Sequence, residues 1–137
     1  MVILGRAHLD AIVTHAVEGW PEEICGILAG RDGRVEDVRR ARNVAETRRV
    51  RFTMNPQDIA AISDEIEAVG LELLGFYHSH AHTQAYPSPT DVADWPGRWY
   101  PDALCFICSL MEEDRPQLRA YRIAESREIA EEVIKVE

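Results

Sequence analysis

The sequence predicts a single α/β domain in which a mixed, largely antiparallel sheet is flanked by helices. Its 137 residues suit one domain, residues 1–137, with one buried core. Two segments repeat apolar residues at the three-and-four spacing of an amphipathic helix. Several short apolar runs lie between turn residues, which is typical of strands. One of these runs, residues 104–111, is apolar at both sets of alternate positions, so a strand covered on both sides is expected there.

Two main helices are expected. The first, residues 7–18, ends before Pro21, because proline biases its predecessor away from helical conformation. The second begins at Asn55, a suitable N-cap, with Pro56 at its first helical position and Gly70 placed to end it. The apolar stripe of this second helix is Ile59, Ile62 and Ile66.

Strands are expected at residues 24–29, 35–43, 71–80, 104–111 and 116–123. Gly33 allows the positive φ of a tight turn between the first two strands. The second strand carries more charge and is expected nearer an edge of the sheet, and residues 44–54 are expected to form a loop. For residues 127–137, Ala and Glu favour a helix, whereas the alternation near the end favours a strand.

Composition excludes several classes of function. The net charge of −9 repels phosphate backbones and argues against a nucleic-acid partner. No apolar run approaches the roughly 20 residues that span a bilayer, and the N-terminus lacks the pattern of a signal peptide. The three cysteines, an odd number, provide no disulfide framework. A cytoplasmic, reduced protein without a membrane partner is expected.

Six of the fifteen basic residues fall within thirteen positions. They are Arg39, Arg40, Arg42, Arg48, Arg49 and Arg51. Two interpretations stay open at this stage: a solvated strand and loop, or a basic patch that meets an acidic protein partner near the entrance of a site.

A candidate metal site lies where the strand at 71–80 ends. His78 and His80 are two residues apart, so on a strand both imidazoles point to one face, with Cα atoms roughly 6.5 Å apart. Asp91 follows eleven residues after His80, enough chain to bring a carboxylate back to the same ion. Two imidazoles and one carboxylate with an open position are typical of a catalytic zinc ion. A His-x-His pair alone would be weak support, because such pairs also occur as ordinary strand residues.

The motif His78-Ser79-His80, followed after seven residues by Ser88 and then Asp91, resembles the signature of the JAMM (MPN+) metalloproteases. This family also has a glutamate just before a strand of the form Glu-x-x-Gly-x-Leu-x-Gly, and Glu23 stands at that position here. The resemblance extends from about residue 5 to the end of the chain, and it favours a strand for the last segment.

The resemblance implies a zinc ion held by His78, His80 and Asp91. It also implies that Glu23 transfers the proton of the attacking water and that Ser88 stabilises the charge developing on the carbonyl oxygen. Taken singly, each residue has an ordinary alternative. Glu23 could be a solvated loop acid, Ser88 only a helix cap, and Asp91 an acid favoured by the helix dipole.

Within the family, the chain is most similar to the short bacterial members of the CysO-cysteine peptidase type. The similarity implies hydrolysis of a peptide or isopeptide bond after the Gly-Gly tail of a ubiquitin-like sulfur-carrier protein, with release of cysteine as one form. A non-catalytic MPN scaffold is the alternative. The sequence does not decide which carrier is cleaved, nor whether the protein works as a homodimer.

The remaining histidines and cysteines are assigned to structure. His82 is expected in the loop, and His8 and His15 on the surface of the first helix. Cys105 and Cys108 are three apart, so on a strand they face opposite sides and cannot share a ligand. Cys25 is expected to be a buried thiol rather than a nucleophile.

Overall fold

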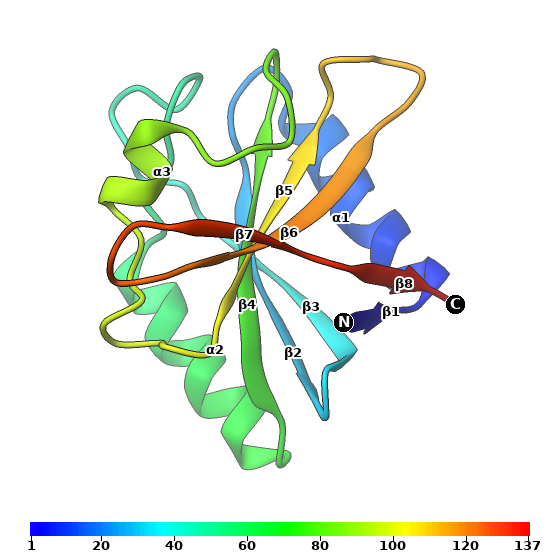
Figure 1. Ribbon diagram of the computed structural model, residues 1–137, viewed down its shortest axis with the longest axis vertical. Coiled ribbons are helices and arrows are strands. Elements are labelled where there is room, and N and C mark those ends of the chain that lie inside the picture. Colours follow the sequence, from blue (N-terminus) through cyan, green and yellow to red (C-terminus); the bar gives the residue numbers. More distant parts are fainter.

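The computed structural model describes residues 1–137 and contains one eight-stranded sheet in the order β7-β6-β5-β4-β2-β3-β1-β8 (Figure 1). The strands are β1 (Val2–Leu4), β2 (Cys25–Arg31), β3 (Arg34–Ala41), β4 (Glu72–His80), β5 (Leu104–Ser109), β6 (Gln117–Ile123), β7 (Ile129–Glu132) and β8 (Ile134–Val136). β1 runs parallel to β3 and β8, and β4 runs parallel to β5, whereas the other neighbours are antiparallel. The predicted fold class, an α/β domain with a mixed sheet flanked by helices, is confirmed.

The two main helices, α1 (Arg6–Gly19) and α2 (Pro56–Ala68), begin and end within one or two residues of the predicted positions. A short third helix, α3, covers Pro89–Ala93. The Asn55 side chain accepts hydrogen bonds from the backbone N–H groups of Gln57 and Asp58, as expected of an N-cap. Gly70 has a φ of +76°, which few other residues adopt, so the chain can leave α2 at this point.

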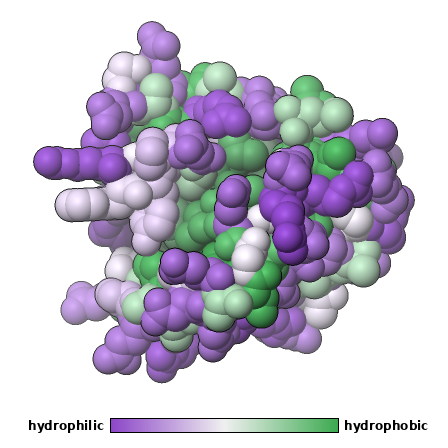
Figure 2. Space-filling model, turned by 90° about the horizontal axis from the view of Figure 1, so that it is seen from below, coloured by the Kyte–Doolittle hydropathy of each residue, from purple (hydrophilic) through white to green (hydrophobic).

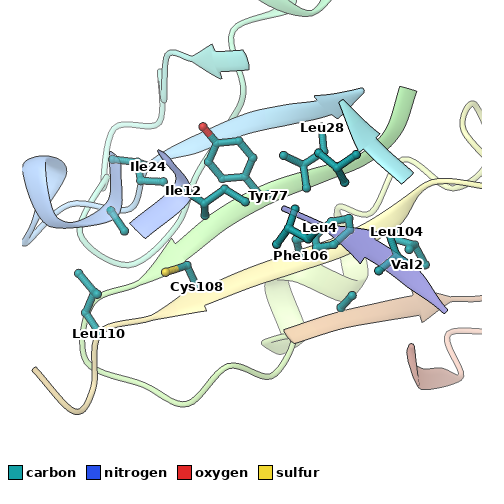
Figure 3. Packing of buried hydrophobic residues seen from close by; sticks show 13 residues of the cluster. Val2, Leu4, Ile12, Ile24, Leu28, Tyr77, Leu104, Phe106, Cys108 and Leu110 are labelled. Carbon is teal, nitrogen blue, oxygen red and sulfur yellow. The ribbon is translucent and has the colours of Figure 1, made fainter. Parts of the chain in front are cut away.

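Hydrophobic cores cover both faces of the sheet, because neighbouring residues of β4 point to opposite sides. Tyr77 packs with Ile12 of α1 and with Phe106 and Cys108 of β5 (Figure 3). Phe76, on the other side, packs with Ile62 and Ile66 of α2. Cys105 belongs to a third cluster on the face opposite Cys108, as predicted, and all three cysteines are free thiols. The site-bearing strand is therefore fixed from both sides.

A single extended segment closes the two edges of the sheet. β7 pairs with β6 at one edge, β8 pairs with β1 at the other, and only Val133 lies between them. The Val133 carbonyl accepts a hydrogen bond from the N–H of Val2 at 2.9 Å. Figure 1 shows this segment, in red, crossing the front of the sheet. The strand predicted for the tail is confirmed, and the helix alternative is wrong.

β3 lies nearer an edge of the sheet than β2, as expected, and β1 pairs with it only at Ile3 and Arg34, so most of its charged length has no strand partner on that side. Two details differ from the sequence-based expectations. β1 was not predicted, because three residues are too few to show a period. His15 is buried rather than on the surface, with 9% of its area exposed, and its Nδ1 lies 2.8 Å from the hydroxyl of Tyr77.

The six-arginine cluster is largely neutralised by acids of the same chain. Arg39 pairs with Asp37 and Glu65, Arg40 with Glu18, Arg42 with Asp58, Arg48 with Glu22, and Arg51 with Asp94. These pairs favour the solvated interpretation over a free basic patch. Each exposed pair stabilises the fold little, since water and salt screen the charges.

The surface is mainly hydrophilic on the face that Figure 2 presents, with hydrophobic residues visible in a hollow near its centre. No helix is long and apolar enough to cross a membrane.

The burial of His15 predicts acid sensitivity. Burial and the charge of Arg40 lower the pKa of His15 to about 4, whereas the unfolded chain titrates near 6.5. The unfolded state therefore binds the proton first, and stability present above pH 6.5 is lost as the pH falls towards 4. Between pH 7.5 and 5, we expect wild type to lose about 2 kcal/mol more free energy of unfolding than His15→Gln. Urea denaturation of both proteins at both pH values measures this, and equal losses would contradict it.

Candidate metal centre

Four buried side chains from three segments meet at one end of the central strands. His78 and His80 lie at the end of β4, Glu23 directly precedes β2, and Asp91 lies in α3. One ligand atom of each of these residues lies within 4.8 Å of the others. The antiparallel pairing of β2 with β4 places Cys25 opposite His78, which brings the segment before β2 to the histidines.

The contacts among the ligand atoms form a small triangle. Nε2 of His78 is 3.1 Å from Nε2 of His80, and Oδ2 of Asp91 is 3.0 Å and 3.1 Å from these two nitrogens. A tetrahedral ion with ligands at 2.0–2.1 Å separates its ligand atoms by about 3.3 Å. The three side chains therefore need only small movements to hold one ion.

The tautomer of His80 shows why a cation fits this triangle. Nδ1 of His80 lies 2.8 Å from the carbonyl oxygen of Gln84, which can only accept, so Nδ1 carries the proton. In the neutral ring, Nε2 then presents a lone pair to the carboxylate of Asp91. Metal-binding histidines commonly donate their other N–H to a backbone carbonyl in this way. Burial also lowers the pKa of His78, which favours its neutral, metal-binding form.

The first turn of α3 orients Asp91. The Ser88 hydroxyl accepts the N–H of Asp91 at 3.0 Å, and Oδ2 of Asp91 accepts the N–H of Ser88 at 2.9 Å, which is a capping box. Burial would raise the pKa of Asp91, but the hydrogen bonds that the His78 and His80 rings donate when Nε2 is protonated outweigh it and hold this pKa well below its usual range. The carboxylate is therefore charged, fixed and aimed at both histidines.

Glu23 differs from the other three, because its Oε1 is buried without a hydrogen-bond partner. Burial and the nearby Asp91 carboxylate raise the pKa of Glu23 to about 7, and the His80 ring opposes them in part when it is protonated. A buried carboxyl group that titrates near neutrality is suited to accept and return a proton. An unpaired buried oxygen also calls for a partner that would occupy the centre.

Three buried side chains fix the loop between His80 and Ser88. They donate to three successive carbonyls: Ser109 to Thr83 at 2.5 Å, His80 to Gln84 at 2.8 Å, and Tyr121 to Ala85. These donors come from β5, β4 and β6, so the sheet itself sets the path of the loop. This path carries the chain from the histidines to the capping box of α3.

A largely apolar cavity of about 420 Å³ opens beside Asp91. Its walls come from the extended segment at residues 52–54, from α2 and β4, and from the chain after α3. Aromatic rings form much of the lining, namely Phe52, Phe76, Trp95 and Tyr100. The Phe52 ring also stacks on His78, with centroids 4.3 Å apart, so the cavity and the centre share a wall.

Comparison with known proteins identifies the family. The family described as prokaryotic homologs of the JAB domain matches residues 5–124. This chain belongs to that family. The resemblance to the JAMM (MPN+) proteins seen in the motif is thereby confirmed.

Individual relatives match over much of this chain. The chain is 41% identical over 109 residues to a desampylase of Haloferax volcanii, and the match covers 73% of this chain and 74% of that protein. It is 33% identical over 140 residues to the CysO-cysteine peptidase of Mycobacterium tuberculosis, covering 98% and 91% of the two chains. A solved protein from Desulfitobacterium hafniense, 29% identical, superposes with a TM-score of 0.85 over 100% of this chain and 93% of its own. A JAB1/MPN domain protein of Archaeoglobus fulgidus, 19% identical, has a TM-score of 0.61 over 99% and 98% of the chains and shares the fold.

The structure brings together Glu23, His78, His80 and Asp91, and it places Ser88 at the cap beside them. His82 lies outside this group. It is exposed in the loop, as expected, and its ring packs edge-on against Trp20 with centroids 5.6 Å apart.

Sequence reasoning missed Phe52, Gln84 and Asn43 as neighbours of the centre. Phe52 and Gln84 are in loops and carry no periodic signal, and Gln84 acts through its backbone. Cys25 lies beside His78, but burial raises the pKa of its thiol to about 12, so it is poorly suited to bind metal as a thiolate.

We expect the protein to bind one divalent metal ion per chain. Asp91→Asn removes the negative charge from one corner of the triangle and should abolish binding. Cys25→Ser is the matched control and should keep one ion, because the thiol is not a ligand. Metal analysis of the dialysed proteins measures this, and loss of metal in Cys25→Ser with retention in Asp91→Asn would contradict the assignment.

Proposed function

We propose that this protein is a zinc metallopeptidase that hydrolyses the bond after the Gly-Gly tail of a ubiquitin-like sulfur-carrier protein. Residues 1–137 form its single catalytic domain, and it acts in the cytoplasm. The proposal rests on the buried carboxyl group of Glu23, whose Oε1 has no hydrogen-bond partner. One oxygen of this carboxyl group lies within 4.8 Å of a ligand atom of each of His78, His80 and Asp91. A solely structural metal site would not need such a group.

His78, His80 and Asp91 are the proposed zinc ligands. Zinc bound there would supply Lewis acidity and lower the pKa of a water molecule towards about 7. The donor set of two neutral imidazoles and one carboxylate suits zinc.

Glu23 is the proposed proton carrier. Its pKa of about 7 means that it can accept the proton of the attacking water and return it to the leaving amine at neutral pH. Burial excludes bulk water from its carboxyl group, which limits loss of the proton to solvent.

Ser88 is the proposed donor to the carbonyl oxygen of the substrate. Its hydroxyl accepts the N–H of Asp91 through a lone pair, so its own proton remains free to donate. A donor fixed by a helix cap stabilises the developing charge without having to reorganise during the reaction.

The extended segment beside the cavity supports an extended substrate tail. The backbone N–H and carbonyl of Phe52 and Met54 form no hydrogen bonds within the chain, whereas Thr53 between them is paired with residues 43 and 44. Alternate unpaired groups of this kind can add a strand from a partner. A Gly-Gly tail has no side chains to obstruct close approach, and the cavity can take an apolar side chain further along the tail.

The names of relatives support the substrate class. They include desampylase, CysO-cysteine peptidase and, at 30% identity over 125 residues, a probable TtuB-protein conjugate cleaving protease of Thermus thermophilus. The scaffold alternative has no support in the structure, because no proposed ligand or catalytic group is missing or displaced.

The test is cleavage of a sulfur-carrier protein ending in Gly-Gly-Cys, measured by intact-protein mass spectrometry. Wild type loaded with zinc should release cysteine. We expect Glu23→Gln to lower kcat by about 10²–10⁴-fold and Ser88→Ala by about 10²–10³-fold, both with the metal retained.

Glu22→Gln is the matched control for Glu23, because Glu22 is an adjacent acid in an exposed pair with Arg48. Its activity should stay close to wild type. Cleavage by Glu23→Gln at the wild-type rate would refute the catalytic role. An inactive wild type with one bound zinc would refute this substrate class.

A further inference from the structure

Asn43 lies where the chain leaves β3, and all the hydrogen-bonding capacity of its side chain is used. Its Nδ2 donates to the carbonyls of Glu23 at 2.9 Å and Arg51 at 3.1 Å. Its Oδ1 accepts the N–H groups of Ala45 and Thr53, each at 3.0 Å. An amide with two donors and two accepting lone pairs is thereby fully satisfied. One side chain therefore joins the segment before β2 to both ends of the loop at residues 44–53.

Both the carbonyl and the N–H of the Glu23 backbone form hydrogen bonds with Asn43 or with the loop that follows it. Asn43 holds its carbonyl, and its N–H donates to the carbonyl of Arg48 at 2.7 Å. The next residue, Ile24, donates its N–H to Oγ of Ser79 at 2.9 Å, which ties the same segment to β4 between the two histidines. The buried Oε1 of Glu23 has no partner of its own. The position of its carboxyl group therefore depends on how firmly its backbone is held.

The same amide also fixes the segment that carries Phe52. Asn43 contacts Arg51 and Thr53, the two residues that flank Phe52. The ring of Phe52 stacks on His78. Loss of the amide would therefore loosen both Glu23 and the ring that packs on a metal ligand.

We propose that Asn43 is a positioning residue that sets the location of Glu23, and with it the rate of the proton-transfer step. The catalytic part of this inference rests on the proposed function. Asn43 forms hydrogen bonds only with backbone groups and with none of the three ligand atoms.

The chemistry of the site explains why an aspartate cannot replace Asn43. Aspartate keeps the shape and the accepting oxygen, so Ala45 and Thr53 would keep their partner. Its second oxygen would face the carbonyls of Glu23 and Arg51, and two acceptors repel each other where a donor had joined them. Asn43→Asp is thus a nearly isosteric change that removes the two donated hydrogen bonds, to Glu23 and to Arg51, and keeps the two accepted ones.

Asn55 provides a matched control twelve residues further along the chain. Its side chain also makes two backbone contacts, but it only accepts, from the N–H groups of Gln57 and Asp58. Asparagine and aspartate are about equally good N-caps, so Asn55→Asp should be tolerated. The two variants make the same chemical change. In Asn43→Asp it removes amide N–H groups that donate hydrogen bonds, whereas in Asn55→Asp it removes N–H groups that donate none.

The experiment compares wild type, Asn43→Asp and Asn55→Asp, each loaded with zinc. Misplacement of a catalytic group by about 1 Å can cost 10²-fold in rate, so we expect kcat of Asn43→Asp to fall by about 10–10²-fold. KM should change by less than about threefold, and zinc content should remain one per chain. Asn55→Asp should retain the wild-type kcat. A wild-type kcat in Asn43→Asp would overturn the proposal, as would a loss of activity that only follows loss of zinc.

A second readout does not depend on catalysis. The amide hydrogen of Glu23, which is bonded to Arg48, should exchange at least about tenfold faster in Asn43→Asp than in wild type or Asn55→Asp. Unchanged exchange would overturn the positioning role. If wild type cleaves no carrier, the proposed function fails, whereas the exchange measurement still decides whether Asn43 holds Glu23.

Discussion

The centre of this JAB domain protein depends on one oxygen atom, Oδ2 of Asp91. It lies about equally far from the Nε2 atoms of His78 and His80, and the N–H of Ser88 fixes it from the other side. When both imidazoles are neutral and direct their Nε2 lone pairs towards this oxygen, three lone-pair atoms so close in a buried site repel each other unless a cation lies between them. The fold supplies the energy that holds them together, because the histidines are on the central strand and the carboxylate is in a capped helix turn.

The surrounding structure limits movement at each of these positions. Cores on both faces fix β4, and one continuous segment closes both edges of the sheet. Side chains from β4, β5 and β6 bind three successive carbonyls of the loop that leads to α3. The Glu23 side chain alone lacks a partner for its Oε1, which is consistent with a group that must exchange a proton rather than hold a ligand in place. Rigid ligands beside one less constrained carboxyl group are the combination that metal-assisted hydrolysis requires.

Much of this arrangement could be predicted from sequence because it depends on local patterns. The period of α2, its Asn55 cap and the His78–His80 spacing each have a direct geometric meaning, and the resemblance added Glu23. Features set by distant contacts could not be predicted in this way. His15 looks like a surface residue of α1 until Tyr77, 62 positions away, covers it. The ion pairs of the arginine cluster, the stacking of Phe52 on His78, and the contacts of Asn43 all join segments whose separation along the chain carries no periodic signal.

The most direct test of the metal centre is X-ray absorption at the zinc K-edge of the zinc-loaded protein. The account predicts a first shell of nitrogen and oxygen at about 2.0–2.1 Å, with the outer-shell scattering of two imidazoles and no sulfur. A sulfur atom at about 2.3 Å would show that Cys25 replaces one of the proposed ligands and would contradict the account. Loss of the bound zinc from Asp91→Asn, and with it of the imidazole scattering, would confirm that the carboxylate at one corner of the triangle is needed to hold the ion.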